Sequence, residues 1–132
     1  MNNFGEKVNF IWNIANLLRG PYKPEDYGEV ILPLSVLRRF DCLLEPTKDD
    51  VLERAEEVDI PELLNKASGF SFHNKSIYDF QKLLEDPDNI AANLREYIRG
   101  FSKNIRDIME NFDFDKEITK LDSNNLLFLV VL

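Results

Sequence analysis

Residues 10–44 read FIWNIANLLRGPYKPEDYGEVILPLSVLRRFDCLL, and they contain the clearest helical pattern of the chain. Apolar side chains recur every three or four residues on both sides of a break at Gly20-Pro21, which predicts two amphipathic helices. Pro24 suits the first turn of the second helix, because the N–H that proline lacks would have no partner there. Pro33 lies inside the second apolar stripe, which continues in phase beyond it. We therefore expect one kinked helix there rather than two separate helices.

The rest of the chain continues the helical pattern, with one interruption. Further helices are expected at residues 47–58, 61–67, 82–85, 89–99, 102–112, 114–121 and, without a stop signal, 126–132. In the helix after residue 102, the side chains expected to face inward are Ile105, Ile108, Met109 and Phe112. Residues 70–80 differ, because Phe70 and Phe72 alternate with polar residues before a turn-like run, which indicates a small hairpin or an extended loop. The predicted fold class is all-α, a multi-helix orthogonal bundle, in which residues 70–80 are either a small β-hairpin or an extended loop.

Length and composition describe one globular domain. The 132 residues are 44% hydrophobic and 30% charged, which is typical of a folded chain that can bury a core. The single cysteine, Cys42, excludes an internal disulfide and suits a reducing compartment. Residues 1–10 do not have the pattern of a secretory signal, and the longest apolar run, residues 126–132, is far shorter than the about 20 residues that cross a bilayer. We therefore expect residues 1–132 to form one helical domain in the cytoplasm, with no membrane contact.

The formal net charge of the chain is −8. A domain that binds DNA by itself usually carries a basic patch, because neutralising phosphates supplies most of the non-specific affinity. This chain is therefore not expected to bind DNA tightly on its own. One group of acidic residues is interpreted as a solvated face, or alternatively as a docking patch for a basic partner. Its members are Asp49, Asp50, Glu53, Glu56, Glu57 and Asp59.

Basic residues in the last third of the chain are spaced by four, four and three positions, and would line one face of an uninterrupted helix. Gly100 and Ser102 are expected to interrupt that helix, so that the basic residues surround a helix–helix corner. They could contact phosphates or a partner protein, or could be ordinary exposed charges paired with Glu96 and Asp107. Two further arginines lie on the second helix, where one of them could pair with Asp41. The candidate DNA or partner contacts are Arg38, Arg39, Arg95, Arg99, Lys103 and Arg106.

No residue pattern points to catalysis. His73 is the only histidine, which excludes histidine clusters for metal binding and paired histidines for acid–base catalysis. His73 lies in the turn-like run, where a surface or partner-contact role is expected, whereas Cys42 on its apolar helix is expected to be a core residue. No glycine-rich nucleotide loop of the dinucleotide or P-loop kind occurs. We expect no catalytic residue, no cofactor and no metal ligand in this chain.

Several segments, taken together, resemble a known family. These segments are residues 10–15, 18–27, 30–41, 64–72, 86–100 and 111–115. Through them the chain resembles the N-terminal helical domain of the modification (DNA adenine methyltransferase) subunit of type I restriction-modification systems. The resemblance implies an all-helical domain beside a catalytic domain that binds S-adenosylmethionine. It also implies a complex with one specificity subunit, a second modification subunit and a restriction subunit, bound to DNA.

The family's catalytic motifs have no counterpart in this chain. Both the methyl-donor glycine motif and the Asn-Pro-Pro-aromatic motif, which holds the flipped adenine, are missing. The resemblance therefore implies a domain that is non-catalytic alone and serves subunit assembly and the clamping of DNA. The catalytic domain is expected to follow residue 132, with residues 126–132 leading into it. The alternative is a free-standing helical protein–protein interaction module.

Overall fold

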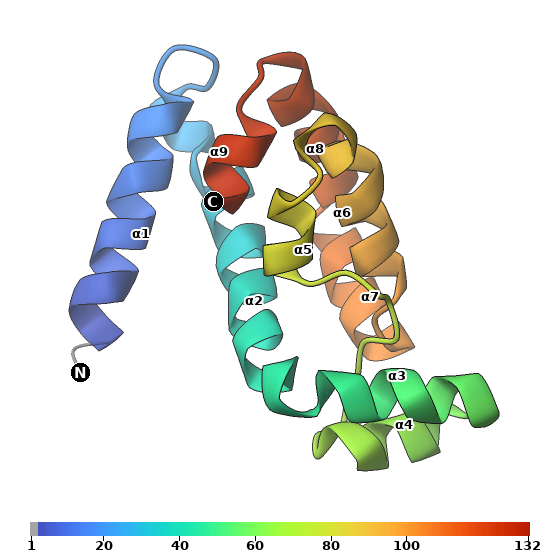
Figure 1. The fold of residues 1–132 in the computed structure, drawn as a ribbon. Coiled ribbons are helices and arrows are strands. Elements are labelled where there is room, and N and C mark those ends of the chain that lie inside the picture. The colour runs from blue at the N-terminus through green and yellow to red at the C-terminus, as the bar shows by residue number, and fades with distance from the viewer. Residues whose placement is uncertain (1–2) are drawn as a thin grey trace.

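The computed structural model describes residues 3–132, which form helices joined by short connections (Figure 1). The α-helices are α1 Asn3–Leu18, α2 Gly28–Leu44, α3 Lys48–Glu57, α4 Pro61–Ser68, α5 Phe80–Leu84, α6 Ile90–Arg99, α7 Lys103–Asn111, α8 Phe114–Ser123 and α9 Leu127–Val131. Single 3₁₀ turns at Pro24–Asp26, Glu45–Thr47 and Pro87–Asn89 lead into α2, α3 and α6. No β-strand occurs among residues 3–132. The predicted all-α bundle is confirmed.

The long helix α2 lies at the centre of the bundle. In Figure 1, α1 lies on one side of α2 and α6 to α8 lie on the other, while α3 and α4 pack together crosswise below its end. The last helix, α9, contacts α1, α5, α6 and α8. The C-terminal end of the described chain therefore fills the space between the first helix and the later ones.

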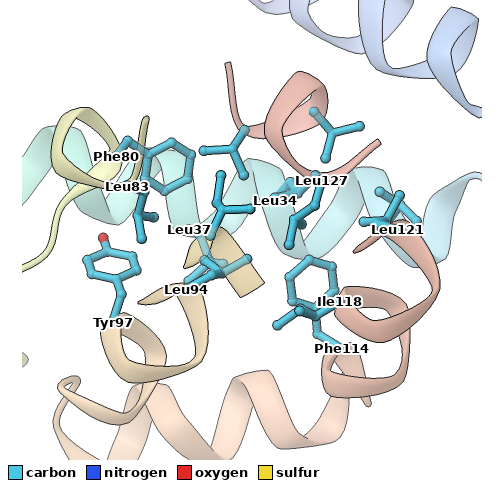
Figure 2. Close-up of a cluster of buried hydrophobic side chains, with 14 of the residues drawn as sticks. Leu34, Leu37, Phe80, Leu83, Leu94, Tyr97, Phe114, Ile118, Leu121 and Leu127 are labelled. Atoms are coloured by element: carbon cyan, nitrogen blue, oxygen red, sulfur yellow. The ribbon is translucent and has the colours of Figure 1, made fainter. Parts of the chain in front are cut away.

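The core forms on one face of α2. Leu34 and Leu37 recur one turn apart and are completely covered, as amphipathic spacing requires. The residues that close this cluster from other helices include Phe80, Leu83, Leu94, Tyr97, Phe114, Ile118, Leu121 and Leu127 (Figure 2). Pro33 is buried within α2, which continues through it as one helix, as predicted. Ile108 of α7 is the exception to the predicted inward set, because it lies at the edge of the apolar stripe and is 39% exposed.

Two helices end at glycines whose backbone conformation is unfavourable for residues with a side chain. Gly20 follows α1 with φ +98°, and Gly69 follows α4 with φ +83°, both in the left-handed region that glycine adopts without steric cost. The N–H of Gly69 donates to the carbonyl of Asn65 and closes the last turn of α4 at 3.0 Å. Both stops agree with the sequence prediction.

Residues 70–79 form a loop, which was one of the two interpretations, and not the alternative β-hairpin; we call this loop the extended segment. The segment pairs with the corner between α6 and α7 through one isolated antiparallel bridge, between Asn74 and Phe101. Backbone groups on either side of this bridge form hydrogen bonds of 2.9 Å to Gly100 and Ser102. A helix–helix corner thus satisfies the backbone groups that a second strand of a hairpin would have satisfied.

The side chain of Asn74 joins this segment to two helices, α3 and α6. Its Nδ2 donates to the carbonyl of Tyr97 at 2.8 Å, and its Oδ1 accepts from the Ser76 N–H at 2.7 Å and from Lys48 Nζ at 3.1 Å. Gly100 lies directly against this group, since an added Cβ would be 2.6 Å from Ser76 Cβ. The φ of Gly100 is an ordinary −74°. Glycine is therefore required here by the closeness of the contact and not by the backbone conformation.

Candidate functional site

A groove of about 260 Å³ lies between α6, α7 and α8. Its apolar lining is Ile98, Met109, Phe114 and Ile118, and its charged lining is Arg95, Arg99, Arg106, Glu110, Asp113 and Asp115. We call this feature the arginine groove. The predicted interruption of the helix is confirmed, because α6 ends at Arg99 and α7 begins at Lys103. Three of the four basic residues nevertheless meet at one groove, because the two helices fold against each other and against α8.

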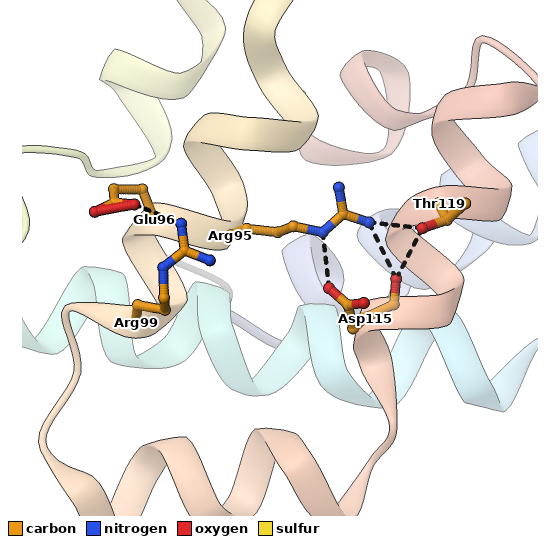
Figure 3. A network of polar contacts seen from close by, with 5 residues as sticks. All are labelled: Arg95, Glu96, Arg99, Asp115 and Thr119. Atoms are coloured by element: carbon orange, nitrogen blue, oxygen red, sulfur yellow. Dashed lines mark hydrogen bonds and ion pairs between the residues drawn. The ribbon is translucent and has the colours of Figure 1, made fainter.

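Arg95 is held in place across two helices. Its Nε lies 2.7 Å from Asp115 Oδ1, and its Nη2 donates to Thr119 Oγ1 at 2.6 Å, so that the side chain spans from α6 to α8 (Figure 3). Only 29% of the Arg95 side chain is exposed. Charge-assisted hydrogen bonds of this length fix the guanidinium at one edge of the groove. The sequence prediction missed Asp115 as a partner, because it lies 20 residues further along and on another helix.

Arg99 and Lys103 form the ordinary surface pairs that were the alternative interpretation. Arg99 pairs with Glu96 on the same helix (Figure 3), and Lys103 Nζ lies 2.8 Å from Asp107 Oδ2. All four side chains are more than half exposed. Because solvent screens such pairs and they contribute only about 0–1 kcal/mol, Arg99 could exchange Glu96 for another acidic group. Lys103 does not line the groove.

Arg106 differs from the other two arginines of the groove in its pairing. It is exposed on α7, and among the side chains that the structure describes no carboxylate forms an ion pair with it. Glu110, one turn further on α7, is likewise without an ion pair to any of these side chains. Asp113, by contrast, lies 3.4 Å from Lys116 Nζ. Arg106 is thus available to a partner, while Arg95 is already engaged.

The two candidate arginines of α2 lie elsewhere. The guanidinium of Arg38 is 3.8 Å from the Asp41 carboxylate, as predicted, and 5.4 Å from the centre of the Phe80 ring. Arg38 lines a second hollow of about 320 Å³, to which α2, α3, α5 and α9 contribute. Arg39 is exposed and lines neither hollow. The six candidates therefore do not form one surface: three line the arginine groove, Arg38 lines the second hollow, and Arg39 and Lys103 lie outside both.

Lys48 in the second hollow is a group that the sequence prediction missed. Its Nζ donates to Asn74 Oδ1 and lies 5.7 Å from the centre of the Tyr97 ring. Burial lowers the pKa of Lys48 to about 8, although the carboxylates of Asp79 and Asp41 act in the opposite direction. Burial also raises the pKa of Asp41, whose Oδ1 accepts from Tyr97 Oη at 3.3 Å. The available signal was a lysine in the first turn of a helix, where the helix dipole disfavours positive charge.

The structure corrects the interpretations of His73 and Cys42. His73 is only 3% exposed, with Nδ1 at 2.7 Å from Asn65 Oδ1 and its backbone N–H donating to Ser102 Oγ at 3.1 Å. It therefore belongs to the buried seam between the extended segment and its neighbours, and not to the surface. Cys42 is exposed and not in the core. Five residues beyond the buried Leu37, it has turned away from the apolar face of α2.

The chemistry available at the arginine groove is that of binding. Its apolar lining can cover an apolar side chain, and its arginines can donate to a carboxylate or a phosphate. Residues 3–132 contain no group of three or more histidines, cysteines, aspartates or glutamates placed to hold a metal ion. Nor does any helix within those residues have the length and hydropathy needed to span a bilayer.

Comparison with known proteins gives one match. The model of the family described as the HsdM N-terminal domain matches residues 7–132, a range that includes the arginine groove and the second hollow. No curated protein and no solved structure gives a significant match. The family match and the all-helical fold agree with the resemblance seen in the sequence. The chain therefore belongs to the HsdM N-terminal domain family, the N-terminal domain of the modification subunit of type I restriction-modification systems.

Proposed function

We propose that this domain serves the assembly of the modification subunit with its partners and its closing around DNA, and that it performs no catalytic step alone. In this proposal the full-length subunit methylates adenine N6 at specific DNA sites in the cytoplasm. A separate catalytic domain of that subunit binds S-adenosylmethionine and the flipped adenine. The observation that carries the proposal is the match of the HsdM N-terminal domain family to residues 7–132.

The proposed partners are the specificity subunit, a second modification subunit and the restriction subunit, with DNA in the assembled complex. The net charge of −8 supports protein contacts over dominant DNA contacts, because a phosphate surface requires positive charge. The arginine groove supports the same choice, because an arginine beside apolar residues is typical of the residues that contribute most at protein interfaces.

One experiment compares the full-length subunit with a version that lacks residues 1–132. The shortened subunit is expected to keep S-adenosylmethionine binding, measured by calorimetry, and to lose assembly with the specificity subunit and methylation of DNA. Retained cofactor binding controls for correct folding of the catalytic domain. Residues 1–132 alone should give no binding isotherm for S-adenosylmethionine. Normal assembly and methylation by the shortened subunit, or a clear isotherm for the isolated domain, would contradict the proposal.

The second candidate function is a free-standing helical interaction module. Trp12 and Ile11 on α1 favour a protein contact of some kind, because they are 60% and 45% exposed and large exposed apolar side chains mark interaction surfaces. The mass of the native gene product separates the two functions. A mass well above 15.4 kDa is expected for a modification subunit, whereas a native mass of 15.4 kDa would leave the interaction module.

A further inference from the structure

We propose that the arginine groove is a protein-docking site that receives an apolar side chain followed by a carboxylate, both supplied by the specificity subunit. This inference rests on the proposed function and deepens it, because it names the chemistry of the partner and the side of the domain that meets it. The competing assignment for the same arginines is the DNA backbone, since guanidinium groups bind phosphates equally well.

The size and lining of the groove suit a side chain. Pockets for small-molecule ligands usually measure about 300–1,000 Å³, and the arginine groove, at about 260 Å³, is smaller than this range. Met109, Phe114 and Ile118 are almost fully buried, so they form the floor, while Ile98 remains partly exposed at the opening. Ile98 still has accessible apolar surface that an apolar side chain would cover, whereas a phosphate gains nothing from covering it.

The charges around the groove also disfavour DNA. Three arginines and three carboxylates line it, so the groove as a whole has no formal net charge. Two of those carboxylates are already paired, Asp115 with Arg95 and Asp113 with Lys116. This leaves Arg106, and Arg99 after release from its exposed pair with Glu96, against the single carboxylate of Glu110. The available charge therefore suits one carboxylate beside the apolar anchor, and not a row of phosphates.

The positions of the arginines also suit such a partner. Arg95 bonds to Asp115 and Thr119, so its side chain spans from α6 to α8 (Figure 3). Arg95 thus lines the groove from α6, while Arg106 lines it from α7, the other helix of the corner. A docked segment would remove water from around Arg106, which strengthens its bond to a carboxylate.

Four variants of the full-length modification subunit test this inference, with the purified specificity subunit as the probe. Arg106→Glu reverses the free charge, and Ile98→Ser removes apolar surface at the opening. Each variant has a matched control outside the groove: Arg54→Glu at an exposed arginine of α3 that has no ion pair within residues 3–132, and Ile108→Ser at an exposed isoleucine of α7. Thermal unfolding confirms that each variant is folded before its affinity is measured.

The dissociation constant for the specificity subunit is expected to rise at least tenfold for each groove variant and less than twofold for each control. DNA binding by the modification subunit, measured in parallel at two salt concentrations, should change equally little in all four. Loss of DNA binding with intact subunit assembly would assign the groove to phosphate and overturn the inference. Loss of self-association alone would assign it to a second copy of the chain, with the same consequence.

Failure of the docking site and failure of the proposed function give different results. If the unmodified subunits assemble and the groove variants assemble equally well, the docking site is refuted and the proposed function stands. If the unmodified modification and specificity subunits do not associate, both the proposed function and the docking site are refuted.

Discussion

Replacing Gly100 with alanine is expected to destabilise the domain, because the corner between α6 and α7 has no room for a methyl group. A Cβ at this position would lie 2.6 Å from Ser76 Cβ, 2.8 Å from Ser76 N and 2.9 Å from Asn74 Oδ1. Two of these atoms belong to the backbone or adjoin it, so rotating a side chain cannot relieve the overlap. The extended segment would have to move away from the corner.

The expected change in the free energy of unfolding is the balance of opposing effects. Overpacking a close contact costs about 1–3 kcal/mol, and displacing Asn74 weakens hydrogen bonds that contribute about 1 kcal/mol each. Alanine also restricts the unfolded chain, which offsets about 0.4–1 kcal/mol, since the φ of −74° at Gly100 is one that alanine adopts readily. We expect the free energy of unfolding to fall by about 2 kcal/mol overall.

Urea unfolding of the 132-residue chain, followed by circular dichroism, measures this change. Gly28→Ala is the matched control, because the nearest atom to its added Cβ is Leu32 Cδ1 at 4.0 Å, and it should be neutral or stabilising by about 0.4–1 kcal/mol. Adding Ser76→Gly should recover part of the loss in Gly100→Ala, and a double-mutant cycle isolates that coupling. A Gly100→Ala protein as stable as the unmodified chain would refute the close contact.

Three further predictions concern buried and bridging polar groups. Tyr22→Phe removes the donor that lies 2.9 Å from the buried carboxylate of Glu117, so it should cost about 1–3 kcal/mol in urea unfolding, and Glu117→Gln should cost less. Burial, followed by the positive charge of nearby residues, lowers the pKa of His73 in the folded chain, so the unfolded chain takes up a proton first as the pH falls. Stability should therefore decrease as the pH falls below the unfolded pKa of about 6.5, and comparing His73→Asn with the unmodified chain at pH 7.5 and 5.5 should show a smaller decrease for the variant. Arg95→Ala should cost less than about 1 kcal/mol, because Asp115 is 78% exposed and solvent screens the pair; a larger loss would show that Arg95 positions α8.

Local features of the sequence were sufficient to predict the helices. Apolar spacing and the stops at Gly20 and Gly69 act within a few residues, and the structure places helices close to the predicted ranges. The same phase argument, applied to α2, would have placed Cys42 away from the buried stripe; the prediction considered only the apolar character of the helix. The exposure of Cys42 could therefore have been predicted from the sequence.

The extended segment shows where local information ends. The alternation of Phe70 and Phe72 with polar residues correctly indicated a break in the helical pattern, and the two rings stack with their centroids 5.3 Å apart. The backbone of the extended segment pairs with the corner at residues 100–102, about 30 positions further along the chain. This pairing buries His73, and no local sequence pattern around residue 73 predicts that burial.

The helical class of this protein, its acidic charge and its family all follow from the order of its residues. Which charged groups meet depends instead on how the helices pack. Arg95 and Arg99 share a helix with Glu96, yet the bond that fixes Arg95 goes to Asp115 on α8, and Arg106 joins the same groove only because α7 folds back at Gly100. Helical periodicity specifies which residues share a face of one helix, whereas the packing of the apolar faces in the core specifies which faces of different helices meet.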